Sequence, residues 1–437
     1  MSAFKLSELI VSFDARPWAR AVIAALALAL IGVTAVWVIH EILIRENWPA
    51  YTDMGLYLDA ANEIAHGRDP YAGDDLGLHR YPYPPLFAGL IAVLVAIFGS
   101  AASYVWITAT AVFFVATLWL INRRFGFTAP LHWILLGAGL LLIGRTARID
   151  LMHGQLNFML MLLLVMGLLS WRAERVRLAS VLWAVAICCK PFLGVIVLFL
   201  LRQGAWKTAL MTFVLSGVIF WASFLPTFPN VFDTFQSWRE TTQHYASPAY
   251  AANPLNQSFY ALGLRLFTVN DFSQPWADAP ILAFLVPALA ALAAGFVFWI
   301  TAAPQKHGAA HEAGAYLLLR FGAALAALLS LGPVTEGDHL FFVLPGLFGA
   351  MALTWSRVRA QSADQLLWIG VTAAWLLLAA VLAWPRQLLL YFGDEASWAH
   401  LKGAGILLSG ANAFLLMGAA APTAIALRRE SKEHRVL

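Results

Sequence analysis

The chain has 437 residues, of which 61% are hydrophobic and only 12% are charged, and its mean hydropathy is +0.73. This composition excludes a soluble globular protein, and the absence of alternating apolar and polar residues excludes a membrane β-barrel. The formal net charge of +4 lies mostly in short loops and the C-terminal tail, so it indicates membrane orientation and no nucleic-acid partner.

Apolar runs recur from Ala21 to Leu427, and a run of roughly 20 apolar residues is long enough to cross a bilayer as a helix. We therefore predict an all-α polytopic membrane protein with about twelve transmembrane spans or half-spans. The first span is longer than the core of a signal peptide, so we expect it to be a retained anchor. Basic clusters favour the cytoplasmic side of a membrane, which places both chain ends there.

Two apolar segments must be irregular if every basic cluster is to lie in the cytoplasm. Residues 84–100 are expected to enter and leave on the outer face, as a re-entrant or interfacial helix. Residues 178–201 are expected to be two half-helices that meet at Lys190, because Pro191 interrupts helical hydrogen bonding. Broken helices are tolerated at membrane depth where they line a cavity.

This arrangement brings the polar loops of the chain to the non-cytoplasmic side, as a single active site requires. These polar segments lie at residues 46–85, 144–155, the break at Lys190, 227–278, 332–339 and 384–400. We predict one integral membrane domain over residues 1–437, with a first outer loop at 44–100, a long outer loop at 227–278 and a cytoplasmic tail at 428–437.

The first outer loop is predicted to contain a short helix that starts near Asp53 and ends at His66. Asp53 and Tyr57 are four residues apart and share one face of that helix. A carboxylate beside a bilayer needs a reason, because ionisable groups there are costly and usually functional. Asp53 is either the N-cap of the helix or a general base that removes a proton from an acceptor hydroxyl. Tyr83 follows in a stiff run of aromatic residues and prolines.

Two arginines and two amide side chains belong to the next outer loop. Arg145 and Arg148 oppose the usual charge bias of an outer face, so they indicate an anionic partner. Gln155 and Asn157, at the mouth of a span, either hydrogen-bond sugar hydroxyls or only cap the helix that follows.

Lys190 lies deep in apolar sequence beside the proline break. A lysine there either snorkels to an interface or pairs with an anion, and the second interpretation is functional. In the long outer loop, Arg265 either grips a phosphate or stays solvated. Asn256 and Gln257 precede it.

The last polar segment contains Glu336, Asp338 and His339. These side chains are of the kinds that bind metals, but no paired spacing of ligands supports a metal site. Capping of the next helix by Thr335 or Asp338 is the simpler explanation. We predict no essential metal and no cofactor.

Taken in order, these motifs resemble the GT-C-fold glycosyltransferases of family 87, which use polyprenyl-phosphate sugars and include mycobacterial mannosyltransferases of phosphatidylinositol mannoside synthesis. The resemblance rests on Asp53, Tyr57, Gly67, Pro70-Tyr71, Tyr83-Pro84-Pro85, Gly154-Gln155-Leu156-Asn157, Lys190-Pro191, Asn256-Gln257-Ser258, Arg265 and Gly332 to Leu340. It implies many transmembrane helices with juxtamembrane helices in the first outer loop, and a catalytic aspartate that matches Asp53. In the family's late motif only His339 is retained, whereas Glu336 and Asp338 replace a tryptophan and a histidine.

The resemblance also implies a reaction and a location. The enzyme would move one sugar, with mannose as the first expectation, from a polyprenyl phosphate to a glycolipid or envelope glycan, inverting C1. It would do so at the periplasmic face of a bacterial inner membrane, surrounded by membrane lipids. Asp53 and His339 would be catalytic, and the substrate would be bound by Tyr57, Tyr83, Arg145, Arg148, Gln155, Asn157, Lys190, Asn256, Gln257, Arg265, Glu336 and Asp338. A secondary transporter or lipid flippase, or an oligosaccharide ligase with a diphosphate-linked donor, are the alternatives.

Overall fold

The computed structural model describes residues 12–13, 15–44, 52–72, 81–125, 131–143, 145–304, 312–335, 337–381 and 401–436. Throughout these ranges the regular structure is helical, apart from one isolated β-bridge between Ser273 and Leu401. The all-α prediction is confirmed. The outer loop at residues 384–400 lies outside the described residues.

Six of the described helical segments are long and apolar enough to cross a membrane. They are Pro17–Ile44, Pro85–Arg124, Trp206–Thr227, Pro280–Thr301, Phe341–Arg359 and Ala411–Glu430. Shorter apolar helices lie at Asn157–Arg172, Val176–Cys189, Pro191–Arg202, Ala313–Leu329 and Gln365–Ala379. The chain is therefore a multi-pass membrane protein.

The contacts between residues divide the chain into two compact units. The first unit comprises Met1–Trp37, Leu118–Arg148 and Ala251–Leu437, and the second comprises Val38–Thr117 and Ile149–Tyr250. Whether these units work as the single membrane domain expected from the sequence stays a prediction.

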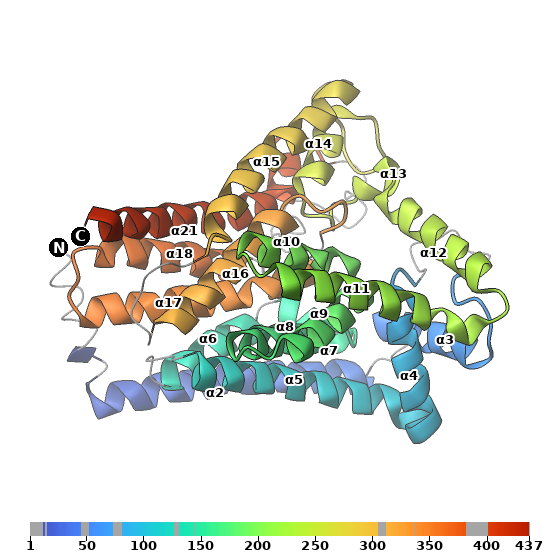
Figure 1. Ribbon diagram of the computed structural model, residues 1–437, viewed down its shortest axis with the longest axis horizontal. Helices are drawn as coiled ribbons and strands as arrows, with labels where there is room; N and C mark the ends of the chain where they lie inside the picture. Colours follow the sequence, from blue (N-terminus) through green and yellow to red (C-terminus); the bar gives the residue numbers. More distant parts are fainter. Residues whose placement is uncertain are drawn as a thin grey trace. The chain divides into compact units, whose positions relative to one another are not determined.

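The second unit contains six of the predicted site residues, namely Asp53, Tyr57, Tyr83, Gln155, Asn157 and Lys190. Its helices are α3 (Asp53–Ala65), α4 (Pro85–Phe98), α5 (Ala102–Arg124, to Thr117), the end of α7 (Arg145–Met152), α8 (Asn157–Arg172), α9 (Val176–Cys189), α10 (Val195–Arg202), α11 (Trp206–Ser223) and α12 (Val231–Ala246). Helix α3 packs on α4, and α9 packs against both α8 and α11 (Figure 1). A Cβ on Gly167 would lie 2.2 Å from the indole nitrogen of Trp183, so only glycine permits this close approach of α8 and α9.

The helix break predicted at Lys190 is confirmed. Helix α9 ends at Cys189, Lys190 is extended with φ −134° and ψ 100°, and a short 3-10 turn, η2 (Pro191–Gly194), leads into α10. The other irregular segment is α4, which begins at Pro85 and is separated from α5 by a turn at Gly99 with φ +55°. That α4 enters and leaves the membrane on one face stays a prediction.

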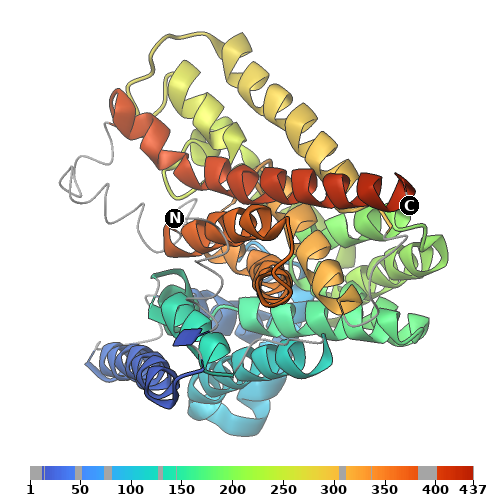
Figure 2. The same cartoon turned by 90° about the vertical axis from the view of Figure 1, so that its left-hand side faces the viewer.

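The first unit is a helical bundle. Its helices are α2 (Pro17–Ile44, to Trp37), α6 (Leu131–Ile143), α14 (Phe259–Phe267), α15 (Pro280–Thr301), α16 (Ala313–Leu329), α17 (Leu344–Arg359), α18 (Gln365–Val381), α20 (Ala404–Ser409) and α21 (Ala411–Val436), with the short α13 (Pro248–Ala251) at its boundary. Helices α17, α18 and α21 pack side by side in the two views (Figures 1 and 2). Glycines 322 and 349 let α16 and α17 approach, since a Cβ on either would lie within 2.5 Å of the other helix's backbone.

Candidate active site

Asp53 is the first residue of α3 and has one carboxylate oxygen held by the protein. The N-cap of α3 is Thr52, so the interpretation of Asp53 as an N-cap is wrong. Asp53 Oδ2 accepts from Gln155 Nε2 at 2.6 Å and lies 3.1 Å from His153 Nδ1. No described residue hydrogen-bonds Oδ1, and the Asp53 side chain is 32% exposed. The carboxylate is thus oriented through one oxygen and open through the other.

The donors to Asp53 come from a tight turn between α7 and α8. The carbonyl of His153 accepts from the amide of Met54 at 2.9 Å, and the carbonyl of Gly154 accepts from the Trp106 indole at 2.7 Å. Gly154 has φ +65°, a left-handed conformation that favours glycine, and a Cβ there would lie 3.1 Å from the Met54 side chain. The turn is therefore fixed to the first turn of α3.

Tyr57 orients Gln155. Its hydroxyl donates to Gln155 Oε1 at 2.9 Å, which leaves the amide NH₂ of Gln155 facing Asp53. The Tyr57 side chain is 1% exposed, and its ring packs edge-on against Phe87 with centroids 4.8 Å apart. Tyr57 thus positions the side-chain amide of Gln155, and its expected contact with substrate stays a prediction.

Removing the Tyr57 hydroxyl should lower turnover without unfolding the protein. In Tyr57→Phe the ring still fills its pocket, but Gln155 loses the bond that fixes its amide, so kcat should fall by about 3- to 10-fold. The measurement is the initial rate of sugar transfer at saturating substrate, with the thermal midpoint as a check on folding. Tyr104→Phe is the matched control, and a Tyr57→Phe enzyme as active as that control would contradict the prediction.

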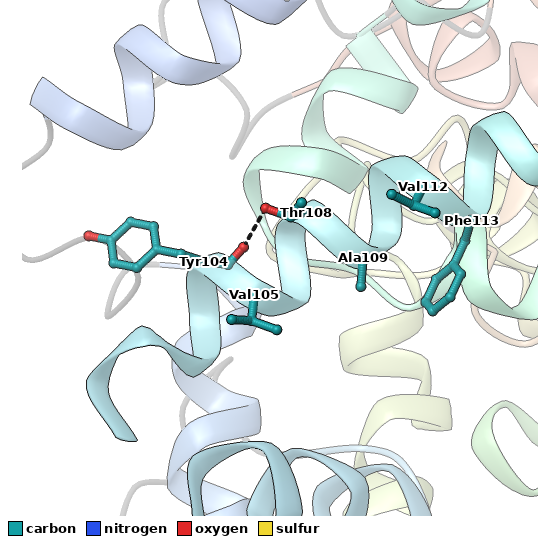
Figure 3. Close-up of a pocket in the computed structure, with 6 residues that line it drawn as sticks. All are labelled: Tyr104, Val105, Thr108, Ala109, Val112 and Phe113. Atoms are coloured by element: carbon teal, nitrogen blue, oxygen red, sulfur yellow. Dashed lines mark hydrogen bonds between the residues drawn. The ribbon is translucent and has the colours of Figure 1, made fainter. Parts of the chain in front are cut away.

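Tyr104 belongs to a shallow apolar hollow on one face of α5 (Figure 3). The hollow is lined by Tyr104, Val105, Thr108, Ala109, Val112 and Phe113. Its one side-chain hydrogen bond in Figure 3 runs from the Thr108 hydroxyl to the Tyr104 carbonyl at 2.8 Å, within the helix. The hollow contains no charged side chain, so it offers no catalytic group.

The side chain of Asn157 forms a buried hydrogen bond with Asp150. Asn157 begins α8, is fully buried, and its amide donates to Asp150 Oδ1. The N-cap position belongs to Leu156, so Asn157 does not cap the helix. Its full burial favours a structural role over contact with a sugar.

Lys190 joins the same cluster of side chains from the helix break. Its side chain is fully buried, and its ammonium lies 5.1 Å from the ring centroid of Tyr83, a cation–π contact. The ring of Tyr83 in turn lies 6.2 Å from that of Tyr57. Lys190 and Asp53 are therefore connected through one continuous set of contacts.

The tyrosines beside Lys190 remain neutral donors. The Tyr71 hydroxyl donates to the Tyr83 carbonyl at 2.6 Å, and the Tyr81 hydroxyl donates to the Pro84 carbonyl at 3.0 Å. Burial raises the pKa of both phenols well above the ordinary value, so neither can serve as a base. They hold the chain that carries Tyr83.

In the first unit, Asn256 holds one loop against another. Its Nδ2 donates to the carbonyls of Ala251 at 3.0 Å and Pro333 at 2.7 Å. Its Oδ1 accepts from the amides of Ser258 at 3.3 Å and Thr335 at 3.0 Å. All its hydrogen-bonding positions are occupied by backbone groups, which favours a structural role, and the expected contact of Asn256 with a sugar stays a prediction.

Gln257 continues this connection. The backbone N–H of Gln257 donates to the carbonyl of Thr335 at 2.6 Å, and its side-chain Nε2 donates to the carbonyl of Pro254 at 2.6 Å. The Thr335 hydroxyl donates to the carbonyl of Leu329 at 2.7 Å, and the N-cap of α17 is Val343 rather than Thr335 or Asp338. These bonds position the segment that leads to His339.

The guanidinium of Arg265 is surrounded by backbone carbonyls. Arg265 is fully buried, and its guanidinium donates to the backbone carbonyls of Ala252, Asn253, Asn256 and Ser409 at 2.9 to 3.4 Å. The interpretation of Arg265 as a solvated side chain is wrong, and its binding of a phosphate stays a prediction. Arg265 ties α14 to its neighbouring loop and to α20.

Arg265 should therefore matter for stability. Arg265→Gln leaves several buried carbonyls without donors, which should lower the free energy of unfolding by about 2–5 kcal/mol. The thermal midpoint in detergent measures this, with exposed Arg239→Gln on α12 as control. If Arg265→Gln were as stable as the control but transferred no sugar, the result would favour a role for Arg265 in substrate binding.

The remaining predicted residues are only partly described. His339 is buried on the 3-10 segment η4 (Gly337–Val343). Glu336 lies outside the described residues, as do the side chains of Arg145, Arg148 and Asp338. Their expected roles stay predictions.

His153 is the contact of Asp53 that sequence reasoning missed. The sequence offered one signal, its position directly before the Gly154-Gln155 pair, and a hundred residues separate it from Asp53. A contact at that separation comes from tertiary folding, which no local pattern reports.

Comparison with known proteins agrees with this architecture. The sequence model of glycosyltransferase family 87 matches residues 81–330, more than half of the chain. The search of curated proteins found no match to the chain. The match confirms the predicted GT-C membrane fold and favours a transferase over a transporter or flippase. It includes His153, Gln155 and Lys190 but begins after Asp53, which is linked to it by the bonds described above.

Proposed function

Because the chain belongs to glycosyltransferase family 87, we propose that it moves a single sugar from a polyprenyl-phosphate donor to a lipid-linked or envelope glycan acceptor, with Asp53 as general base. The observation that carries the proposal is the Asp53 carboxylate, held through Oδ2 by Gln155 and His153 and open at Oδ1. A carboxylate oriented in this way has the geometry that a base requires.

The proposed chemistry is a single displacement. The acceptor hydroxyl gives its proton to Asp53 as its oxygen forms a bond to C1 of the sugar. The bond between C1 and the phosphate oxygen breaks at the same time, and the phosphate leaves with the electron pair. Attack from the face opposite the phosphate inverts C1, by the geometric logic that separates inverting from retaining glycosidases.

Lys190 is proposed to stabilise the leaving phosphate. A monophosphate gains negative charge as it departs, and a fixed cation in a poorly hydrated site stabilises such charge strongly. Lys190 is buried and lies within the contact set that leads from Tyr83 to Asp53. Arg145 and Arg148 are further candidates for the phosphate. With fixed cations present, the proposal requires no metal ion.

Mannose is the first sugar to test, and the periplasmic face of the inner membrane is the proposed location. The positive-inside distribution of basic residues supports this orientation. Glu336 and Asp338 depart from the family's late motif, so the test includes sugars other than mannose. His339 is proposed to orient the donor sugar.

The test uses purified protein in nanodiscs. A labelled short-chain polyprenyl-phosphate mannose is supplied with a lipid extract from the host, and label in a new glycolipid is expected. Other polyprenyl-phosphate sugars follow if mannose is not transferred. Transfer from a diphosphate-linked oligosaccharide alone would indicate a ligase. If no donor were used, the proposed reaction would be overturned.

A further inference from the structure

In the proposed reaction His153 only helps to hold the Asp53 carboxylate, and its charge plays no part. Its Nδ1 lies 3.1 Å from Asp53 Oδ2, and its side chain is 33% exposed. We infer that His153 is a positioning residue for the base, and that its charge state sets the acidic limit of sugar transfer. The inference rests on the proposed function, since it concerns the same carboxylate.

The contact with Asp53 selects one tautomer of the His153 imidazole. An ionised carboxylate only accepts hydrogen bonds, so the nitrogen that faces it must carry the proton. Nδ1–H then donates to Asp53 Oδ2, and the lone pair of the neutral ring resides on Nε2. No described residue hydrogen-bonds Nε2, which leaves that atom able to take up a second proton from water.

The backbone of His153 is held firmly enough for this role. Its carbonyl accepts from the Met54 amide, one residue after Asp53, at 2.9 Å. The following residue, Gly154, has a left-handed conformation and accepts from Trp106, while the amide of Gln155 donates to the carbonyl of Asp150 at 2.9 Å. The imidazole is therefore presented to Asp53 by a turn that is anchored on both sides.

Protonation of His153 weakens the base. A positive imidazolium next to Asp53 stabilises the ionised carboxylate and makes it a poorer proton acceptor. The titratable side chains gathered here are Asp53 and Tyr57 on α3, Tyr83 before α4, Asp150 on α7 and Lys190 after α9. Among the described residues, Asp53 is the one within ion-pair distance of His153. Transfer should therefore slow as the pH falls through the range in which imidazole gains its charge.

The first experiment measures kcat/KM against pH for three proteins. The wild type should lose activity on the acidic side of its profile, because a charged His153 makes Asp53 a poorer proton acceptor. His153→Asn keeps an N–H near the position of Nδ1 but cannot titrate, so its acidic limb should move to lower pH, with activity at pH 8 within about tenfold of wild type. His153→Ala removes the donor and should lose about 10- to 100-fold at pH 8, and its acidic limb should also move to lower pH because alanine carries no ionisable group.

Two outcomes of that experiment overturn the inference. An unchanged acidic limb in His153→Asn would assign the titration to another group. A loss of three or more orders of magnitude in His153→Asn at pH 8 would make Nε2 of His153 the base itself, with Asp53 as its orienting partner.

A second measurement does not depend on activity. Nitrogen NMR of protein with labelled histidine, compared with His153→Asn to identify the signal, should show the Nδ1-protonated tautomer at pH 8. Asp53→Ala should abolish that preference. The other tautomer in the wild type would overturn the inference even if no donor were turned over, whereas a wild type that transfers no sugar contradicts only the proposed function.

Discussion

Replacing Asp53 with asparagine should reduce kcat by about two to four orders of magnitude, the contribution expected of a general base. The amide has nearly the same shape as the carboxylate, and its oxygen can still accept from Gln155 and His153. It cannot take a proton from the acceptor hydroxyl at neutral pH. The thermal midpoint should therefore change little while transfer is nearly lost.

The measurement is single-turnover transfer of label from the donor, which separates the chemical step from product release. Asp59→Asn is the matched control, because Asp59 lies on the same helix but about 120° around its axis from Asp53. Near-normal turnover in Asp53→Asn would remove Asp53 as the base and leave His153 as the candidate.

Local chemistry was enough to predict several elements that shape this site. Helix α3 begins at Asp53 and is followed by the C-cap His66, as expected from the sequence. The break at Lys190 follows from Pro191, which cannot continue the hydrogen bonding of α9. Such features depend on a few adjacent residues, so a single sequence can indicate them.

The partners of individual side chains could not be predicted in this way. Asp53 meets residues that are 100 and 102 positions away, and Arg265 donates to a carbonyl 144 positions away. An arginine that binds phosphate and one that clamps buried carbonyls have the same local sequence signature. Only the packing of distant helices separates the two, which is why Arg265 and Asn256 were expected at the substrate and lie in structural contacts.

Lys190 provides the sharpest contrast between a structural and a functional charge. Lys190→Met keeps the length of the side chain and removes the charge, so kcat should fall by about 10²–10³ if the ammonium stabilises the leaving phosphate. The thermal midpoint should fall by less than in Arg265→Gln, because methionine keeps the apolar packing of the lysine stem. Lost activity with a smaller loss of stability would contrast with the outcome expected for Arg265→Gln.

The measurement pairs single-turnover transfer with thermal melting, and Lys190→Arg is the matched control. Arginine preserves the positive charge at the helix break but presents a planar group in place of a compact one, so it should recover only part of the rate. The Tyr83 ring, 5.1 Å from the ammonium, accepts either cation on its face. If Lys190→Met instead melted early and transferred sugar at the wild-type rate, the lysine would be holding the break between α9 and α10, and the leaving phosphate would need another partner, with Arg145 and Arg148 next to be tested.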